Sequence, residues 1–123
     1  MSRGKHLLIL ERNMDLVKIV GPFLNTQNYS TFATSNIESA LKKMDNQRYD
    51  LLIIDSSIGQ RQVSDLLKRI MPMGSLNRTT AILMTTNDLS FELPEEQANR
   101  ITKVLLKPYD LPTILGNVNE LAA

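Results

Sequence analysis

The sequence predicts an α/β fold in which a single doubly wound sheet of five parallel strands carries helices on both faces. One observation is that short apolar runs alternate with longer stretches of helical spacing along the chain. Another is that three runs, Leu7–Leu10, Leu51–Ile54 and Ala81–Met84, are apolar without alternation, as parallel strands covered on both faces are. These three are expected at the centre of the sheet. The full set of expected strands is His6–Leu10, Tyr29–Ala33, Leu51–Ile54, Ala81–Met84 and Lys103–Leu106.

The first two helices are predicted from spacing and from residues typical of helix ends. The segment Asp15–Leu24 has helical spacing, but Gly21-Pro22 predicts a kink or an early end, because an interior proline removes a backbone donor and clashes with the preceding turn. Ser35, followed three residues later by Glu38, forms a capping box. This pair predicts that the second helix begins at that point.

The remaining helices follow the third, fourth and fifth expected strands. Val63–Met71 carries apolar residues at helical spacing and predicts the third helix. Within Asp88–Arg100, a helix is expected to begin near Leu93 or Pro94, because proline is tolerated in a first turn and acidic residues follow it. Leu111–Leu121 has apolar residues along one side and predicts the last helix.

Composition limits the class of protein. The length of 123 residues predicts one domain, residues 1–123. Hydrophobic residues make up 42%, and no apolar run approaches the roughly 20 residues that cross a bilayer, so a soluble protein with no membrane partner is expected. The absence of a secretory signal layout and of cysteines predicts a cytoplasmic location. The formal net charge of +1 gives no basic excess, so no direct nucleic-acid partner is expected.

Polar side chains gather where the expected strands end. In an open parallel sheet, the loops at the carboxyl ends of the strands form the ligand crevice. The residues that follow four of the strands are Glu11-Arg12-Asn13, Asp55-Ser56-Ser57, Thr85-Thr86-Asn87-Asp88 and Lys107-Pro108. A carboxylate in such a set can be a nucleophile that forms an acyl phosphate, while a lysine and a hydroxyl bind the transferred oxygens. The pattern therefore favours phosphoryl chemistry.

Four segments resemble, in their order and spacing, the receiver domains of two-component response regulators. They are Lys5–Arg12, Tyr49–Asp55, Thr80–Thr85 and Val104–Pro108, and the resemblance covers nearly the whole chain. It implies a flavodoxin-like receiver fold with strand order 2-1-3-4-5.

The resemblance also implies a role for each matching polar residue. Asp55 is expected to be the phosphoacceptor, Thr85 the hydroxyl that contacts the phosphoryl group, and Lys107 the cation that pairs with it. The peptide bond between Lys107 and Pro108 is expected to be cis, as it is in the family.

The end of the first strand departs from the family pattern. Receivers normally have two adjacent acids there, one binding Mg²⁺ directly and the other largely through water, whereas this chain has Glu11 and Arg12. An arginine is permanently charged and cannot coordinate a cation, so the direct ligand is replaced. If Mg²⁺ is retained as a cofactor, its ligands are Asp55, Glu11 as the remnant of the acidic pocket, and the backbone of Ser57. Arg12 can instead pair with Asp55. This pairing would either block phosphorylation of that carboxylate or replace the positive charge of the metal.

Two further departures concern the signalling side of the domain. The loop Ser56–Gln62 lacks the usual Met-Pro and later glycine, so its shape is expected to differ from that of the family. Val104 stands where an aromatic residue commonly couples phosphorylation to the output surface. A valine has no ring that can swing inward with the threonine.

The leading hypothesis is a phosphorelay receiver rather than an enzyme. A sensor histidine kinase or a histidine phosphotransfer protein would donate its phosphoryl group to Asp55, and a downstream output protein or domain would distinguish the two conformations. The alternative is a pseudo-receiver, a protein-interaction module in which Arg12 replaces the metal and Asp55 is not phosphorylated. A nucleotide or flavin binder is disfavoured because no glycine-rich loop follows the first strand. A metal-dependent hydrolase is disfavoured because Ser57 stands where a second acid is usual.

Overall fold

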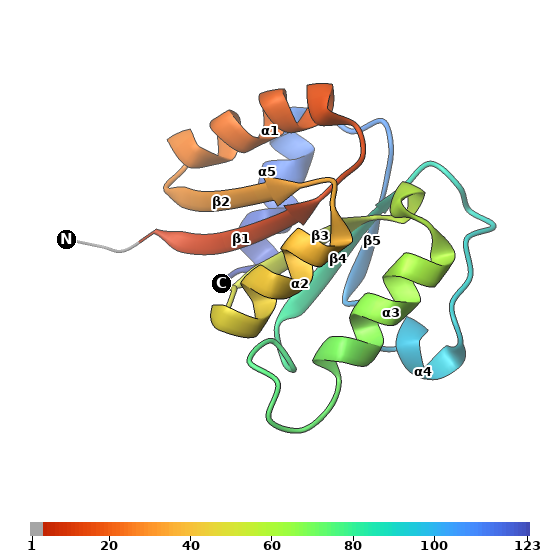
Figure 1. The fold of residues 1–123 in the computed structure, drawn as a ribbon. Helices are drawn as coiled ribbons and strands as arrows, with labels where there is room; N and C mark the ends of the chain where they lie inside the picture. Colours follow the sequence, from red (N-terminus) through yellow and green to blue (C-terminus); the bar gives the residue numbers. More distant parts are fainter. Residues whose placement is uncertain (1–3) are drawn as a thin grey trace.

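A computed structural model describes residues 4–123, in which five parallel strands form one sheet (Figure 1). The strands are β1 (Lys5–Leu10), β2 (Tyr29–Thr34), β3 (Leu51–Asp55), β4 (Ala81–Thr86) and β5 (Lys103–Leu106). Their order across the sheet is β2-β1-β3-β4-β5, and every neighbouring pair is parallel. The predicted doubly wound sheet and its strand order are confirmed.

Helices cover both faces of the sheet. The helices are α1 (Met14–Thr26), α2 (Ile37–Asn46), α3 (Gln60–Ile70), α4 (Glu95–Ala98) and α5 (Leu111–Leu121). α1 and α5 pack on one face, and α2 and α3 on the other, with α4 beside α3 (Figure 1). In β1, Leu8 and Leu10 pack with α2 and α3, whereas Leu7 and Ile9 pack with α1 and α5. Because both faces are buried, the central strands are apolar without alternation.

α1 runs through Pro22 to Thr26, so of the kink or early end predicted there, the early end is wrong. Asn13 caps the helix, because its side chain accepts hydrogen bonds from the backbone N–H groups of Asp15 and Leu16. Pro22 is exposed, so the carbonyl that loses its helical partner can be hydrated. Leu24 lies in the next turn and is fully buried. Its packing against the sheet keeps the last part of α1 helical.

The cap of α2 is Asn36, so the predicted cap at Ser35 is wrong. The Asn36 side chain accepts a hydrogen bond of 3.1 Å from the backbone N–H of Ser39. The backbone N–H of Asn36 in turn donates to the Thr34 hydroxyl at 3.0 Å. Serine and asparagine are both good cap residues. The bond to the end of β2 is what holds Asn36, the second of the two, at the capping position.

A single 3₁₀ turn, η1 (Ser56–Ile58), follows β3, and α3 then begins at Gln60, earlier than the predicted Val63. The Asp55 side chain caps η1 by accepting a hydrogen bond from the backbone N–H of Ser57. Gly59 has a φ of +118°, a conformation that favours glycine because it has no Cβ. This glycine lets the chain turn from η1 directly into α3.

The last two helices begin where the sequence predicts. α4 follows Pro94 and has acidic residues in its first turn, but it ends at Ala98 after only four residues. α5 is capped by Asp110, whose side chain accepts a hydrogen bond of 2.8 Å from the backbone N–H of Thr113. Among residues 4–123, no helix is both long enough and apolar enough to cross a membrane.

A buried asparagine ties the loop before β4 to the rest of the fold. The side-chain amide of Asn77 donates to the carbonyls of Met44 at 2.8 Å and Gln47 at 2.9 Å. Its side-chain oxygen accepts from the backbone N–H of Tyr49 at 2.8 Å and from the Thr80 hydroxyl at 3.0 Å. Asn77 is 1% exposed and makes all the hydrogen bonds that an amide side chain can make. It therefore links the end of α2 to the starts of β3 and β4.

Candidate functional site

The carboxyl ends of four strands bring together Glu11, Asp55, Thr85 and Lys107. Asp55 is the last residue of β3, and Thr85 is its partner in the register of β4. Glu11 directly follows β1, and Lys107 directly follows β5. Because parallel strands end at the same edge of the sheet, the four side chains meet there, in the place where open α/β sheets bind ligands. The gathering predicted from the sequence is present.

The Asp55 carboxylate is buried, with 2% exposure, and accepts four hydrogen bonds. Its Oδ1 accepts from the Thr85 hydroxyl at 2.8 Å and from Lys107 Nζ at 3.1 Å. Its Oδ2 accepts from the backbone N–H of Ser57 at 3.1 Å and from the Ser57 hydroxyl. A carboxylate has about four acceptor positions, so all of them are occupied.

Lys107 connects the two carboxylates of the site. Its Nζ lies 2.8 Å from Glu11 Oε1 and 3.1 Å from Asp55 Oδ1. The second oxygen of Glu11 accepts a hydrogen bond of 3.1 Å from the backbone N–H of Asn13. The peptide bond from Lys107 to Pro108 is cis, as the sequence predicted. One ammonium group therefore holds the ends of β1, β3 and β5 together.

The ionisation of the site follows from these contacts. Burial by itself would raise the pKa of Asp55, but its side-chain hydrogen bonds, that from Ser57 foremost, and the charge of Lys107 lower it below its ordinary value. Burial would likewise lower the pKa of Lys107, but its bonds to Glu11 and Asp55 raise it. At neutral pH Asp55 is a carboxylate and Lys107 an ammonium.

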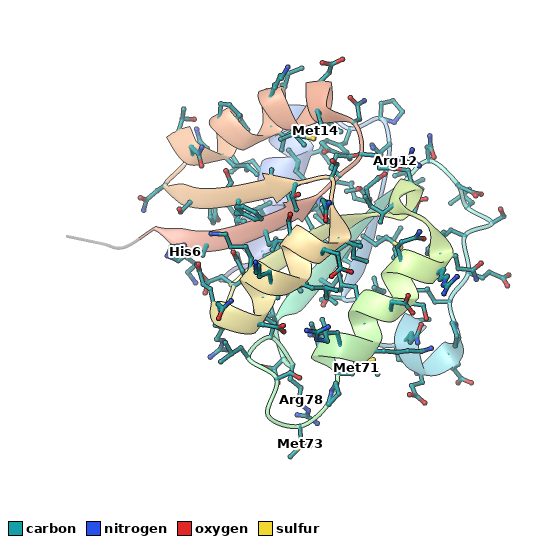
Figure 2. All side chains as sticks on the ribbon, viewed as in Figure 1. His6, Arg12, Met14, Met71, Met73 and Arg78 are labelled. Carbon is teal, nitrogen blue, oxygen red and sulfur yellow. The ribbon has the colours of Figure 1, made fainter. Side chains whose placement is uncertain are left out.

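Arg12 forms no ion pair with Asp55, so the pairing anticipated from the sequence is wrong. Its Nη1 donates instead to the backbone carbonyl of Ser57 at 3.3 Å. Arg12 is exposed, and Lys107 already lies against Asp55. Figure 2 shows Arg12 beside the turn that follows β3, while His6 lies at the opposite end of β1, away from the site.

The sequence model of the response regulator receiver domain matches residues 7–119. The chain belongs to the response regulator receiver domain family. Receiver domains are signalling modules of two-component systems rather than classical enzymes, and they interact with sensor histidine kinases and output domains.

Solved structures of receiver domains share this fold. The chemotaxis response regulator CheY4 of Vibrio cholerae is 24% identical, with a TM-score of 0.80 over 98% of this chain and 99% of that one. The receiver domain of a sensor histidine kinase from Pseudomonas aeruginosa, with a magnesium ion coordinated in its active site cleft, is 15% identical, with a TM-score of 0.78 over 97% and 98% of the two chains. An orphan response regulator of H. pylori is 19% identical, with a TM-score of 0.75 over 99% and 100%. None of the curated proteins matches the chain.

Receiver domains typically bind Mg²⁺, but the donor set of this receiver domain does not fit that ion. Mg²⁺ needs oxygen ligands in near-octahedral geometry. Arg12 replaces one ligand, and its guanidinium donates to the carbonyl of Ser57, a second expected ligand. Lys107 occupies both remaining carboxylates, Glu11 and Asp55. In the part of the chain that the structure describes, no cluster of three or more His, Cys, Asp or Glu side chains is arranged to hold a metal ion.

Two residues of this receiver site were not predicted from the sequence as side chains of the site. The hydroxyl of Ser57 bonds Asp55, although only the backbone of Ser57 was considered. Tyr109 lies near both carboxylates, and burial together with the charges of Glu11 and Asp55 raises its pKa to about 12. The signal for Ser57 was its place two residues after an aspartate, where a serine commonly joins a side-chain cap.

Proposed function

We propose that this receiver domain accepts a phosphoryl group on Asp55 from the phosphohistidine of a kinase or phosphotransfer protein, and that it does so without magnesium. The observation that carries the proposal is that the two oxygens of the Asp55 carboxylate accept hydrogen bonds from different donors. Thr85 and Lys107 both bind Oδ1, so Oδ2 is the oxygen from which neither withdraws density, and it faces the Ser57 turn. The lowered pKa of Asp55 keeps the nucleophile ionised at neutral pH.

The positive charges of the site lie where a phosphoryl group on Asp55 would need them. Lys107 Nζ is 3.1 Å from Asp55 and stays protonated, because its bonds to the two carboxylates raise its pKa. The Thr85 hydroxyl is 2.8 Å from the same oxygen and can move to a phosphoryl oxygen. Arg12 donates to the Ser57 carbonyl at 3.3 Å, so its guanidinium lies at the turn that faces Oδ2. The two cations would thus offset the added negative charge, and the hydroxyl would donate a hydrogen bond to it.

Thr85 connects the site to exposed residues of the neighbouring strand β5. In the register of β4 and β5, Thr85 pairs with Leu105. The neighbours of Leu105 on β5, Val104 and Leu106, are 51% and 49% exposed. Withdrawal of Thr85 toward a phosphoryl group would therefore shift the strand that carries these two apolar side chains. This is the surface we expect an output partner to distinguish in the two states.

Intact-mass measurement tests the proposal. The protein is incubated with phosphoramidate, which has a phosphorus–nitrogen bond like that of phosphohistidine, with and without Mg²⁺. We expect a phosphoryl adduct in both conditions, at similar rates, and none for Asp55→Asn. A rate that depends strongly on Mg²⁺ would contradict the assignment of the positive charge to Lys107 and Arg12.

The second candidate function is a pseudo-receiver, an interaction module that is not phosphorylated. It is favoured by the four donors that fill the acceptor positions of Asp55 and by the contact of Arg12 with the Ser57 carbonyl. No adduct in either condition, from a protein that is folded by circular dichroism, would contradict phosphorylation of Asp55 and favour this function instead.

A further inference from the structure

Of the two donors on Oδ2 of Asp55, the Ser57 hydroxyl is the one that can leave by rotation about a single bond. On the other oxygen, Thr85 is a residue of the central strand β4 and is 1% exposed. Lys107 is also held by Glu11 at 2.8 Å. The backbone N–H of Ser57 is fixed by the 3₁₀ turn η1. The Ser57 side chain, in contrast, is on an exposed residue and has a single side-chain rotor.

The hydroxyl also occupies the oxygen that would react. Oδ2 of Asp55 accepts from both the N–H and the O–H of Ser57. A carboxylate oxygen has about two acceptor positions, so no lone pair on Oδ2 is directed at an incoming phosphorus. Formation of an oxygen–phosphorus bond needs one of these positions, and the hydroxyl is the donor that can vacate it.

We infer that Ser57 is a positioning residue. Its hydroxyl caps the nucleophilic oxygen of Asp55 and so limits the rate at which Asp55 is phosphorylated. The inference rests on the proposed function. In the transfer, the hydroxyl rotates away, Oδ2 forms a bond to phosphorus, and the phosphorus–nitrogen bond of the donor breaks. The electron pair of that bond goes to the donor nitrogen, which takes up a proton from solvent.

The surroundings of Ser57 allow this rotation. Arg12 and Ile58, the residue after Ser57, line an open groove of about 520 Å³ together with Ser35, Ile37 and Gln62. Ser57 is itself exposed, so its hydroxyl can turn from Asp55 to water. Arg12 meanwhile holds the carbonyl of Ser57 at 3.3 Å, so the backbone of η1 can stay in place while the side chain turns.

The test uses Ser57→Ala, with Ser56→Ala as the matched control. Ser56 is in the same 3₁₀ turn, but its hydroxyl donates to the Thr86 hydroxyl at 2.6 Å rather than to Asp55. The initial rate of phosphoryl labelling is measured by intact mass over a range of phosphoramidate concentrations. Ser57→Ala should raise the maximal rate about tenfold, because a hydrogen bond to a charged group is worth about 1.4 kcal/mol or more. The donor concentration at half-maximal rate should stay unchanged.

Rescue by a conservative variant separates capping from a structural effect. Ser57→Thr restores a hydroxyl, so it should label at the rate of the parent protein, as should Ser56→Ala. A Ser57→Ala rate equal to or below that of the parent, with the parent labelled, would overturn the capping role and leave the proposed function intact. Labelling of none of the four proteins would overturn both.

Discussion

Replacement of Lys107 by methionine is predicted to destabilise the fold far more than the same change at Lys103. Lys107 Nζ lies 2.8 Å from Glu11 Oε1 and 3.1 Å from Asp55 Oδ1, and these two side chains are 5% and 2% exposed. Lys103 Nζ, at the start of β5, lies 3.6 Å from Glu120 Oε2, in a side chain that is 63% exposed. Methionine removes the charge and keeps a side chain of similar length at both positions.

The magnitudes follow from the burial of the partners. Removal of one member of a buried ion pair costs about 3–5 kcal/mol, because it leaves an uncompensated buried charge. The 18% exposure of the Lys107 side chain favours the lower figure, about 3 kcal/mol. An exposed pair such as that of Lys103 contributes about 1 kcal/mol or less. At about 4 °C per kcal/mol, the Tm of Lys107→Met should fall by about 12 °C.

Urea unfolding followed by circular dichroism measures the free energy of unfolding of each variant. The pKa of Asp55 is lower in the folded state than in the unfolded state, so its pairing stabilises the fold above the unfolded-state pKa and is lost as the pH falls through the folded-state pKa. The difference between the Lys107 and Lys103 variants should therefore be full at pH 7 and shrink as the pH falls below about 4. Equal losses of stability at pH 7 would refute the claim that Lys107 neutralises buried charge.

Three other predictions concern the metal, the core and the pH dependence. Arg12→Asp should create Mg²⁺ binding, because it restores an oxygen ligand and frees the backbone carbonyl of Ser57 that Arg12 contacts. Calorimetry measures this binding, and failure to bind would show that Arg12 alone does not exclude the ion. Asn77→Ala should lower the free energy of unfolding by about 3 kcal/mol, because four hydrogen bonds, three of them buried, lose their partner. Asn46→Ala, at an exposed residue, should cost under about 0.5 kcal/mol, and similar urea midpoints for the two variants would contradict this. Tyr109 should titrate at about 12 by ultraviolet absorbance, so its stabilising effect is present below about pH 10 and lost as the pH rises toward 12; Asp55→Asn should lower this pKa, and an unchanged value would exclude the influence of Asp55.

The fold and the gathering of polar side chains were predictable because they depend on local patterns. Apolar runs specify buried strands, and polar residues after them must meet at one edge of a parallel sheet. Errors arose where two local signals compete. Ser35 and Asn36 are both good helix caps, and a hydrogen bond to Thr34 decides between them. Pro22 predicts a kink or an early helix end, but the helix continues past it to the buried Leu24.

Contacts between distant residues were harder to predict. The partners of Asn77 include backbone atoms 28 to 33 positions away, and no periodic pattern marks them. The direction of the Arg12 side chain depends on which group has already occupied Asp55. Lys107, 52 positions along the chain, takes that place, so Arg12 turns to the carbonyl of Ser57. Sequence order identified the members of the site but not their pairing.

The strand-end polar residues have a consequence for folding. β4 is buried on both faces and mostly apolar, so hydrophobic patterning alone discriminates weakly against a shift of one residue along β3. A shift in one direction would place Met84 opposite Asp55, which removes the hydroxyl. A shift in the other direction would place Thr86 there, but Thr86 could then no longer reach Ser56. The polar residues at the strand ends therefore help to set the register of β3 and β4. A variant with apolar residues at this edge would bury more apolar surface but would lose the hydrogen bonds that favour one register over its neighbours.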